Sequence, residues 1–135
     1  MAKVLVADVP EMHDRIAECL PGHELEFVST LAQAAVALRH DGYSLIVIGL
    51  HFDESRMFEL LTHVRSLPAY EHAAVICVQG LEQTVPEPVM RTVDMAVKAL
   101  GGTAFVDLRD ESHHFRRHCD FLDRVASEGS PLRPN

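Results

Sequence analysis

Five short apolar runs alternate along the chain with segments whose apolar residues recur every three to four positions. The runs predict buried strands, and the segments between them predict helices that each bury one face. We expect strands at 4–7, 25–28, 45–48, 73–78 and 103–106, and helices at about 12–20, 31–40, 58–67, 89–100 and 111–126. This strict alternation predicts an α/β fold, a five-stranded parallel sheet with helices on both faces.

Composition sets the class of protein. The 135 residues are 47% apolar and 24% charged, which predicts one soluble globular domain over 1–126 and a flexible tail over 127–135. Twelve basic against 20 acidic residues give a net charge of −8, which disfavours nucleic acid and membrane surfaces as partners. The acidic total instead favours a protein partner with a basic patch. The longest clean apolar run, 45–50, is too short to span a membrane.

The cysteines point to a reducing compartment. Cys19, Cys77 and Cys119 are odd in number, far apart and form no CxxC pair, which predicts reduced thiols and a cytoplasmic location. No signal-peptide pattern opens the chain, which agrees with that location. Cys77 falls in a predicted central strand, where an apolar environment raises a thiol pKa and makes it unreactive.

The order and spacing of these segments resemble the receiver domain of two-component response regulators. The most specific stretch is LAQAAVALRHDGYSLIVIGLHFDESRMFELLTHVRS at 31–66, and KVLVADVPEM, AAVICVQG and ALGGTAFVDL fit the same order. The resemblance covers nearly the whole chain. It implies the flavodoxin-like (βα)5 fold and a role in phosphorelay signal transduction.

The resemblance also locates a phosphorylation pocket, and here the chain departs from the family. Gly49 stands at the acceptor aspartate, Asp8 and Val9 at the metal-binding acidic pair, Gln79 at the hydroxyl residue and Leu108 at the lysine. Only Asp8 keeps its chemistry, and the family's mobile aromatic is matched by Phe105. Glycine offers no nucleophile, and Mg²⁺ needs several anionic oxygens. The sequence therefore predicts a pseudo-receiver that is not phosphorylated, holds no metal or cofactor and is not an enzyme.

By the same resemblance, the chain would act on another signalling protein, or on a second copy of itself, through its fourth helix, fifth strand and fifth helix, 89–125. The exposed candidates on that face are Arg91, Asp94, Lys98, Arg109, His113, Arg116 and Arg117.

Other readings of single residues remain open. Asp53 or Glu54 is a candidate for a displaced phosphoryl acceptor, although a solvated loop explains both. Asp8, His51 and Gln79 are candidates to line a small-ligand or metal site beside Gly49.

The HHFRRHC run places His114 and His118 four residues apart, a spacing that can share a transition metal, with Cys119 next to them. Because Arg116 and Arg117 would repel a cation, a polar surface is the favoured interpretation. His13 and His51 supply no catalytic set by themselves.

Overall fold

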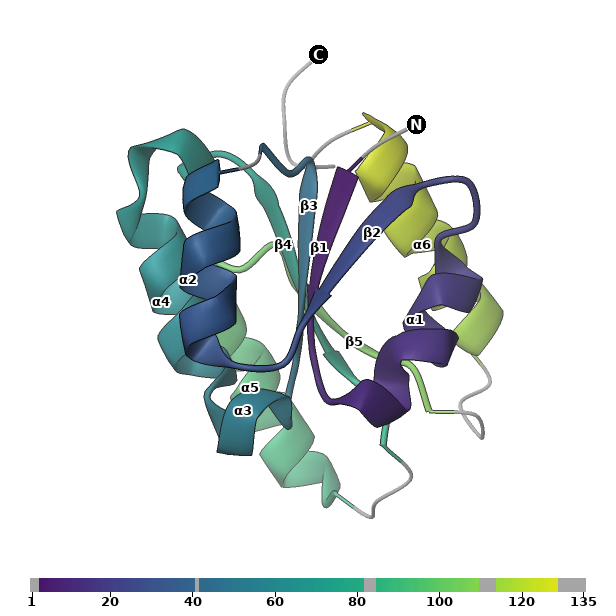
Figure 1. The fold of residues 1–135 in the computed structure, drawn as a ribbon. Helices are drawn as coiled ribbons and strands as arrows, with labels where there is room; N and C mark the ends of the chain where they lie inside the picture. The colour runs from purple at the N-terminus through teal and green to yellow at the C-terminus, as the bar shows by residue number, and fades with distance from the viewer. Residues whose placement is uncertain (1–2, 41, 82–84, 110–113, 129–135) are drawn as a thin grey trace.

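The fold is a single parallel sheet, seen in a computed structural model that describes residues 3–40, 42–81, 85–109 and 114–128. The strands are β1 (Lys3–Ala7), β2 (Glu24–Val28), β3 (Leu45–Gly49), β4 (Ala74–Gln79) and β5 (Ala104–Asp107). Their order across the sheet is β2-β1-β3-β4-β5, and all four pairings are parallel (Figure 1). The predicted α/β architecture is confirmed.

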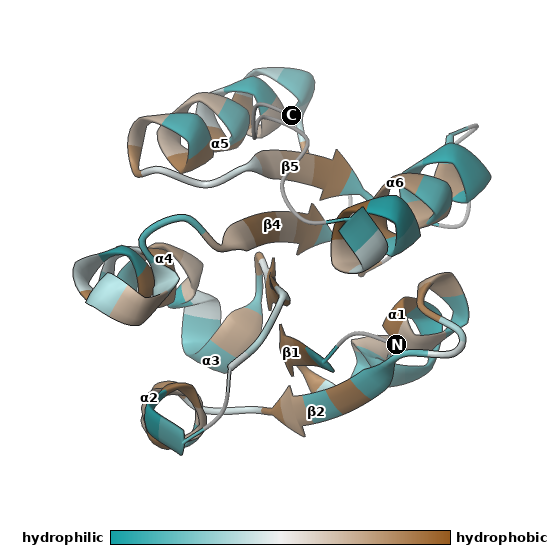
Figure 2. Cartoon of the chain, turned by 90° about the horizontal axis from the view of Figure 1, so that it is seen from above, coloured by the Kyte–Doolittle hydropathy of each residue, from teal (hydrophilic) through white to brown (hydrophobic). Residues whose placement is uncertain are grey.

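Helices cover both faces of the sheet. On one face lie α1 (His13–Cys19) and α6 (Phe115–Glu128), and on the other α2 (Leu31–His40), α4 (Met57–Ser66) and α5 (Glu87–Ala99) (Figure 2). Short 3-10 turns at Pro10–Met12 and Pro68–Tyr70 complete the described elements. The last helix was expected from about residue 111, but α6 begins at Phe115, and 110–113 lie outside the described residues.

Two hydrophobic cores fill the space between the sheet and its helices. Every residue of β3 and β4 is buried, because a central parallel strand has a helix layer on each face. Along β3, Ile46 and Ile48 enter the core under α2, α4 and α5, while Leu45 and Val47 enter the core under α1 and α6. The parallel register brings the strand ends at Ala7, Gly49 and Gln79 to one edge.

The side chains of Thr30 and Gln33 bind backbone donors at the start of α2. The N–H of Gln33 donates to Thr30 Oγ1 at 3.1 Å, and Gln33 Oε1 accepts from the N–H of Ser29 at 2.9 Å. The first contact satisfies a backbone donor in the first turn of α2, and the second satisfies the N–H of the residue before Thr30.

The prediction of three reduced thiols is wrong for two of them. Cys19 of α1 and Cys119 of α6 form a disulfide, with their Cα atoms 4.4 Å apart and 100 residues between them in sequence. Both cysteines are buried where the two helices pack together, a proximity that linear spacing does not encode. Because these two cysteines are bonded, they do not support a reducing compartment.

Cys77 behaves as predicted. It is a free thiol, fully buried in β4, and burial raises its pKa to about 12, with a smaller opposing effect from Arg65. Such a thiol stays protonated and unreactive. Within the described part of the chain, no helix has the length and apolar character needed to cross a membrane.

A left-handed turn follows β3 where the sequence predicts only a polar loop. In the segment α3 (Phe52–Ser55), the φ angles of Asp53, Glu54 and Ser55 are 44°, 57° and 68°. This backbone region costs about 1–2 kcal/mol for a residue other than glycine. The turn directs Asp53 so that its Oδ2 accepts the N–H of Leu31 at 2.8 Å, at the first turn of α2.

Replacing Ser55 with glycine is expected to stabilise the protein. Ser55 is exposed and left-handed, so Ser55→Gly relieves about 1 kcal/mol of backbone strain without loss of packing. Urea unfolding measures the gain. Ser55→Ala is the matched control, because alanine keeps the Cβ and should give no gain. Equal stability of the two variants would contradict the left-handed turn.

Candidate functional site

The carboxyl group of Asp8 occupies the space above Gly49. Asp8 follows β1 directly and is 2% exposed, and its Oδ1 accepts the N–H of Val9 at 2.8 Å. A Cβ built on Gly49 would overlap Cγ and both carboxylate oxygens of Asp8. Position 49 can therefore carry no side chain while Asp8 keeps this rotamer. The position that the resemblance assigns to the acceptor is filled by a carboxyl group from the neighbouring strand.

This carboxyl group holds its proton unusually tightly. Burial raises the pKa of Asp8 to about 7, the nearby charge of Glu11 adds to the rise, and the hydrogen bond from Val9 opposes it. A carboxyl group with this pKa is only partly ionised at neutral pH. Because it carries less negative charge than an ordinary carboxylate, the group is a weaker ligand for a metal cation.

Apolar side chains fill the neighbouring volume. Leu108, at the position matched to the lysine, is fully buried and packs in the core beneath α1 and α6. A Cβ on Gly80 would overlap the side chain of Met12, which packs in the same core. The interior of this edge is therefore packed with hydrocarbon next to the carboxyl group.

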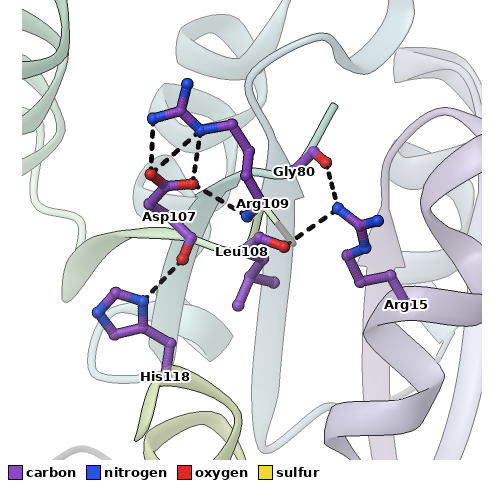
Figure 3. Close-up of polar contacts among 6 residues, drawn as sticks. All are labelled: Arg15, Gly80, Asp107, Leu108, Arg109 and His118. Carbon is purple, nitrogen blue, oxygen red and sulfur yellow. Dashed lines mark hydrogen bonds and ion pairs between the residues drawn. The ribbon is translucent and has the colours of Figure 1, made fainter. Parts of the chain in front are cut away.

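Arg15 of α1 joins the ends of two strands at this edge. Its Nη1 donates to the carbonyl oxygen of Gly80 at 2.7 Å and to that of Leu108 at 3.2 Å (Figure 3). The N–H of Leu108 also donates to the carbonyl of Gln79 at 2.7 Å. Arg15 is not among the residues expected from the sequence, because nothing in its spacing marks it as different from a solvent-exposed helix residue.

Three polar side chains at this edge contain buried atoms without partners. The amide of Gln79 is fully buried, and neither Oε1 nor Nε2 has a hydrogen-bond partner among the described residues. The same holds for Nε2 of His13 and Nε2 of His51. The His13 ring stacks on Phe27 of β2 with centroids 4.3 Å apart, so it lies toward the edge strand.

A Mg²⁺ ion, which the resemblance implies, does not fit this donor set. Asp8 is the one carboxylate among the matched positions, and Val9, Gly49 and Leu108 offer no side-chain oxygen. Among residues 3–40, 42–81, 85–109 and 114–128, no three His, Cys, Asp or Glu side chains lie close enough to share an ion. A hard cation prefers six or more oxygen ligands, which is more than these positions supply.

The other candidate groups are engaged elsewhere. The carboxylate of Asp53 binds the start of α2, and Glu54 is exposed. In the HHFRRHC run, His118 Nδ1 pairs with the carbonyl of Asp107 at 2.7 Å and Cys119 is in the disulfide. The rings of His114 and His118 are 6.1 Å apart.

The face formed by α5, β5 and α6 carries the candidate docking residues. Arg91, Lys98, Arg116 and Arg117 are exposed, whereas Asp94 and Arg109 are half-buried. Asp94 pairs with Lys98 at 3.1 Å on α5. His113 lies outside the described residues. A shallow groove of about 380 Å³ crosses this face, and Arg91, Phe105, Asp107, Arg109 and His118 contribute to its lining.

Asp107 and Arg109 form the best-defined ion pair on this face. Arg109 Nη2 lies 2.7 Å from Asp107 Oδ2, and Arg109 Nε lies 2.9 Å from Oδ1 (Figure 3). Burial alone would raise the pKa of Asp107, but hydrogen bonds and charge from Arg109, with a smaller effect of His118, hold it below its usual value. These contacts hold the side chain of Arg109 against Asp107 of β5.

Apolar side chains on α5 add to this face and were missed from the sequence. Met95 is 70% exposed, Val89 46% and Leu100 39%. The signal was available, because Met95 lies nearly opposite Val93 and Val97, the buried stripe of α5. Exposed methionine is common at protein-binding surfaces.

Asp8→Asn is expected to stabilise the protein in a pH-dependent way. Because the folded-state pKa of Asp8 is raised from 3.8 to about 7, its contribution to stability is greatest below pH 4 and is lost as pH rises to 7. Asparagine resembles the protonated form at every pH. Its stability advantage should therefore grow by about 2–3 kcal/mol between pH 5 and pH 8. Urea unfolding of both proteins at the two pH values measures it, and a constant difference would contradict the raised pKa.

Gly49→Ala is expected to destabilise the fold by about 1–3 kcal/mol, because the new Cβ displaces the buried carboxyl of Asp8. In an Asp8→Ala background the same substitution should cost far less. Gly42→Ala is the control, since a Cβ there meets nothing within 4 Å. Equal costs of Gly49→Ala in both backgrounds, measured by urea unfolding, would refute the overlap.

Comparison with known proteins gives a consistent fold. No protein-family model matches the chain, and no curated protein matches it in sequence. A phosphorylated cyanobacterial phytochrome response regulator, RcpA, superposes with TM-score 0.74 at 15% identity, covering 98% of this chain and 99% of the other. A response regulator from Hahella chejuensis gives 0.74 at 20% identity, with 98% and 100% covered.

The chemotaxis response regulator CheY4 of Vibrio cholerae gives TM-score 0.69 at 21% identity, covering 93% of this chain and 98% of that one. All three solved proteins are response regulators, and each is covered over nearly its full length. At these identities the likeness concerns the fold alone. The chain has the flavodoxin-like fold of response-regulator receiver domains.

Proposed function

We propose that this chain is a receiver-fold signalling module that acts through protein–protein contacts and is not itself phosphorylated. One observation carries the proposal: the carboxyl of Asp8 fills the space over Gly49, where an acceptor side chain would begin. Phosphoryl transfer to a carboxylate depends on a positioned nucleophile and on cations that neutralise the developing charge. Leu108 and Gly49 supply neither, so the proposed role includes no catalysis.

The proposed contact surface is the face of α5, β5 and α6. It combines the exposed apolar residues Met95 and Val89 with the exposed arginines Arg116 and Arg117. An apolar centre with charged residues around it is the usual composition of a protein interface. The arginine pair gives this part of an acidic chain local positive charge.

The partner is proposed to be another signalling protein, with a second copy of this chain as the alternative occupant of the same face. The proposal includes a cytoplasmic location. It also includes no binding to nucleic acid or membranes, which the net charge of −8 supports. The role proposed for Phe105, movement between two positions, requires a partner that binds one position more tightly.

Charge reversal on α6 tests the contact surface. Arg116→Glu with Arg117→Glu should abolish capture of the partner, because both side chains are exposed on α6, one of the elements of the proposed face. Arg39→Glu with Arg56→Glu is the matched control, since it makes the same charge change at exposed positions on the opposite side of the sheet. Quantitative pull-down followed by mass spectrometry identifies proteins lost only with the α6 variant. Retention of every partner would refute this surface.

The absence of phosphorylation has a direct test. Amide NMR during titration with Mg²⁺ and beryllofluoride, which mimics a phosphorylated carboxylate, should leave the signals of Asp8, Gly49 and Gln79 unmoved. Treatment with a small phosphodonor such as acetyl phosphate should add no mass. Saturable shifts or covalent labelling would mean that a carboxylate such as Asp53 has taken the acceptor role.

A second candidate function is small-ligand binding at the same edge. The favouring observation is the fully buried Gln79 amide together with Nε2 of His51, both without partners among the described residues. Buried polar groups nearly always find a partner, so a polar ligand would gain from them. A thermal-shift screen with nucleotides and divalent ions tests it, since ligands of the native state raise Tm. Gln79→Leu should remove any such shift.

A further inference from the structure

The disulfide lies in a seam between two helices of the same layer. Cys19 and Cys119 are 2% and 1% exposed, and α1 packs against α6 around them. In the same seam, His23 Nε2 lies 2.6 Å from Asp123 Oδ1, four residues along from each cysteine. We call this set, Cys19–Cys119 and His23–Asp123, the α1–α6 seam.

α6 is held to the sheet by one apolar stripe and a few polar contacts. Its buried residues are Cys119, Leu122, Val125 and Ala126, a single apolar stripe on a helix that is otherwise largely charged. A polar contact, His118 Nδ1 to the carbonyl of Asp107, connects its first turn to β5. The covalent bond lies within this apolar stripe and cross-links α6 to α1 in addition to the packing.

We propose that the Cys19–Cys119 disulfide is a reversible redox latch that holds α6 against α1. When a dithiol reductant acts, its thiolate attacks one sulfur, the S–S bond breaks, and the other cysteine leaves as a thiolate that takes a proton. The second thiol of the reductant then closes on the mixed disulfide and releases the first cysteine. Two electrons and two protons pass to the protein, and the reductant becomes a disulfide.

Burial sets the kinetics of this latch. Because both sulfurs are shielded, a reductant reaches them only when the seam opens locally. Reduction by dithiothreitol should therefore be on the order of 100-fold slower in the native protein than in guanidinium. Bond formation, in contrast, is favoured by the native packing, which brings the two Cα atoms to 4.4 Å.

The latch matters for the surface proposed above, and this step rests on the proposed function. Arg116 and Arg117 precede Cys119 on α6, so loosening α6 displaces the arginines of the docking face. In a cytoplasmic protein, a disulfide is more often transient and redox-sensing than permanent. The docking face would then be complete in the oxidised protein and incomplete after reduction.

The first experiment establishes the bond and its local effect. Alkylation of the unfolded, unreduced protein should label Cys77 alone, and prior reduction should allow three labels. Hydrogen exchange followed by mass spectrometry then compares oxidised and dithiothreitol-reduced protein. Exchange in 115–128 should rise at least about 10-fold on reduction, while β1 and β3 stay unchanged. Oxidised glutathione should restore the slow exchange.

Three outcomes would overturn the latch. Three labelled cysteines without reduction would mean that the bond does not form. Unchanged exchange in 115–128 would mean that α6 does not depend on it. A uniform rise over all segments would mean that the bond only stabilises the whole fold. Cys77→Ala is the control, because it removes a buried thiol and keeps the disulfide.

The variant Cys19→Ala with Cys119→Ala should reproduce the reduced state and ignore oxidant. If that variant does not fold, the reduced natural chain still gives the comparison. Partner capture by oxidised and reduced protein is measured separately. Failure of capture in both states, with the exchange difference intact, would refute the proposed docking function and leave the latch standing.

Discussion

The packing of Asp8 over Gly49 is the constraint on which the functional edge depends. Two neighbouring parallel strands end at the same level, so the residue after β1 and the last residue of β3 compete for one volume. In this chain the carboxyl of Asp8 occupies that volume, and Gly49 has no side chain to enter it. Position 49 carries no nucleophilic side chain, and desolvation raises the pKa of the Asp8 carboxyl to about 7. A pocket with one weakly ionised group has little attraction for a divalent cation.

The other residues at this edge are consistent with the packing of Asp8 over Gly49. Leu108 and Met12 extend the hydrophobic core up to the ends of the strands, and Arg15 supplies its charge to backbone carbonyls. By donating to the carbonyls of Gly80 and Leu108, Arg15 holds the ends of β4 and β5 together and so stabilises this edge. Among the described residues, the Gln79 amide and Nε2 of His13 and of His51 have no partner, and buried polar atoms are costly without one.

The layer of α1 and α6 brings together the two ideas about function. The same helix presents Arg116 and Arg117 to solvent and Cys119 to the seam. The contact surface proposed on α6 would therefore be connected to a covalent bond whose formation depends on the redox environment. The opposite layer has no such connection. There, Asp53 in its left-handed turn and the Thr30–Gln33 pairing define where α2 starts.

The sequence by itself determined the fold class, the five strands and most helix boundaries, because hydrophobic periodicity is a local property that residue types carry directly. It also determined that Val9, Gly49 and Leu108 carry no charged or hydroxyl side chain. Tertiary structure alone decided what occupies the vacated space, since only the register of β1 against β3 brings Asp8 over Gly49. It alone decided that Cys19 and Cys119 pair across 100 residues and that Arg15 bridges β4 and β5. These are contacts between distant segments, and their geometry arises from helix packing that no local pattern records.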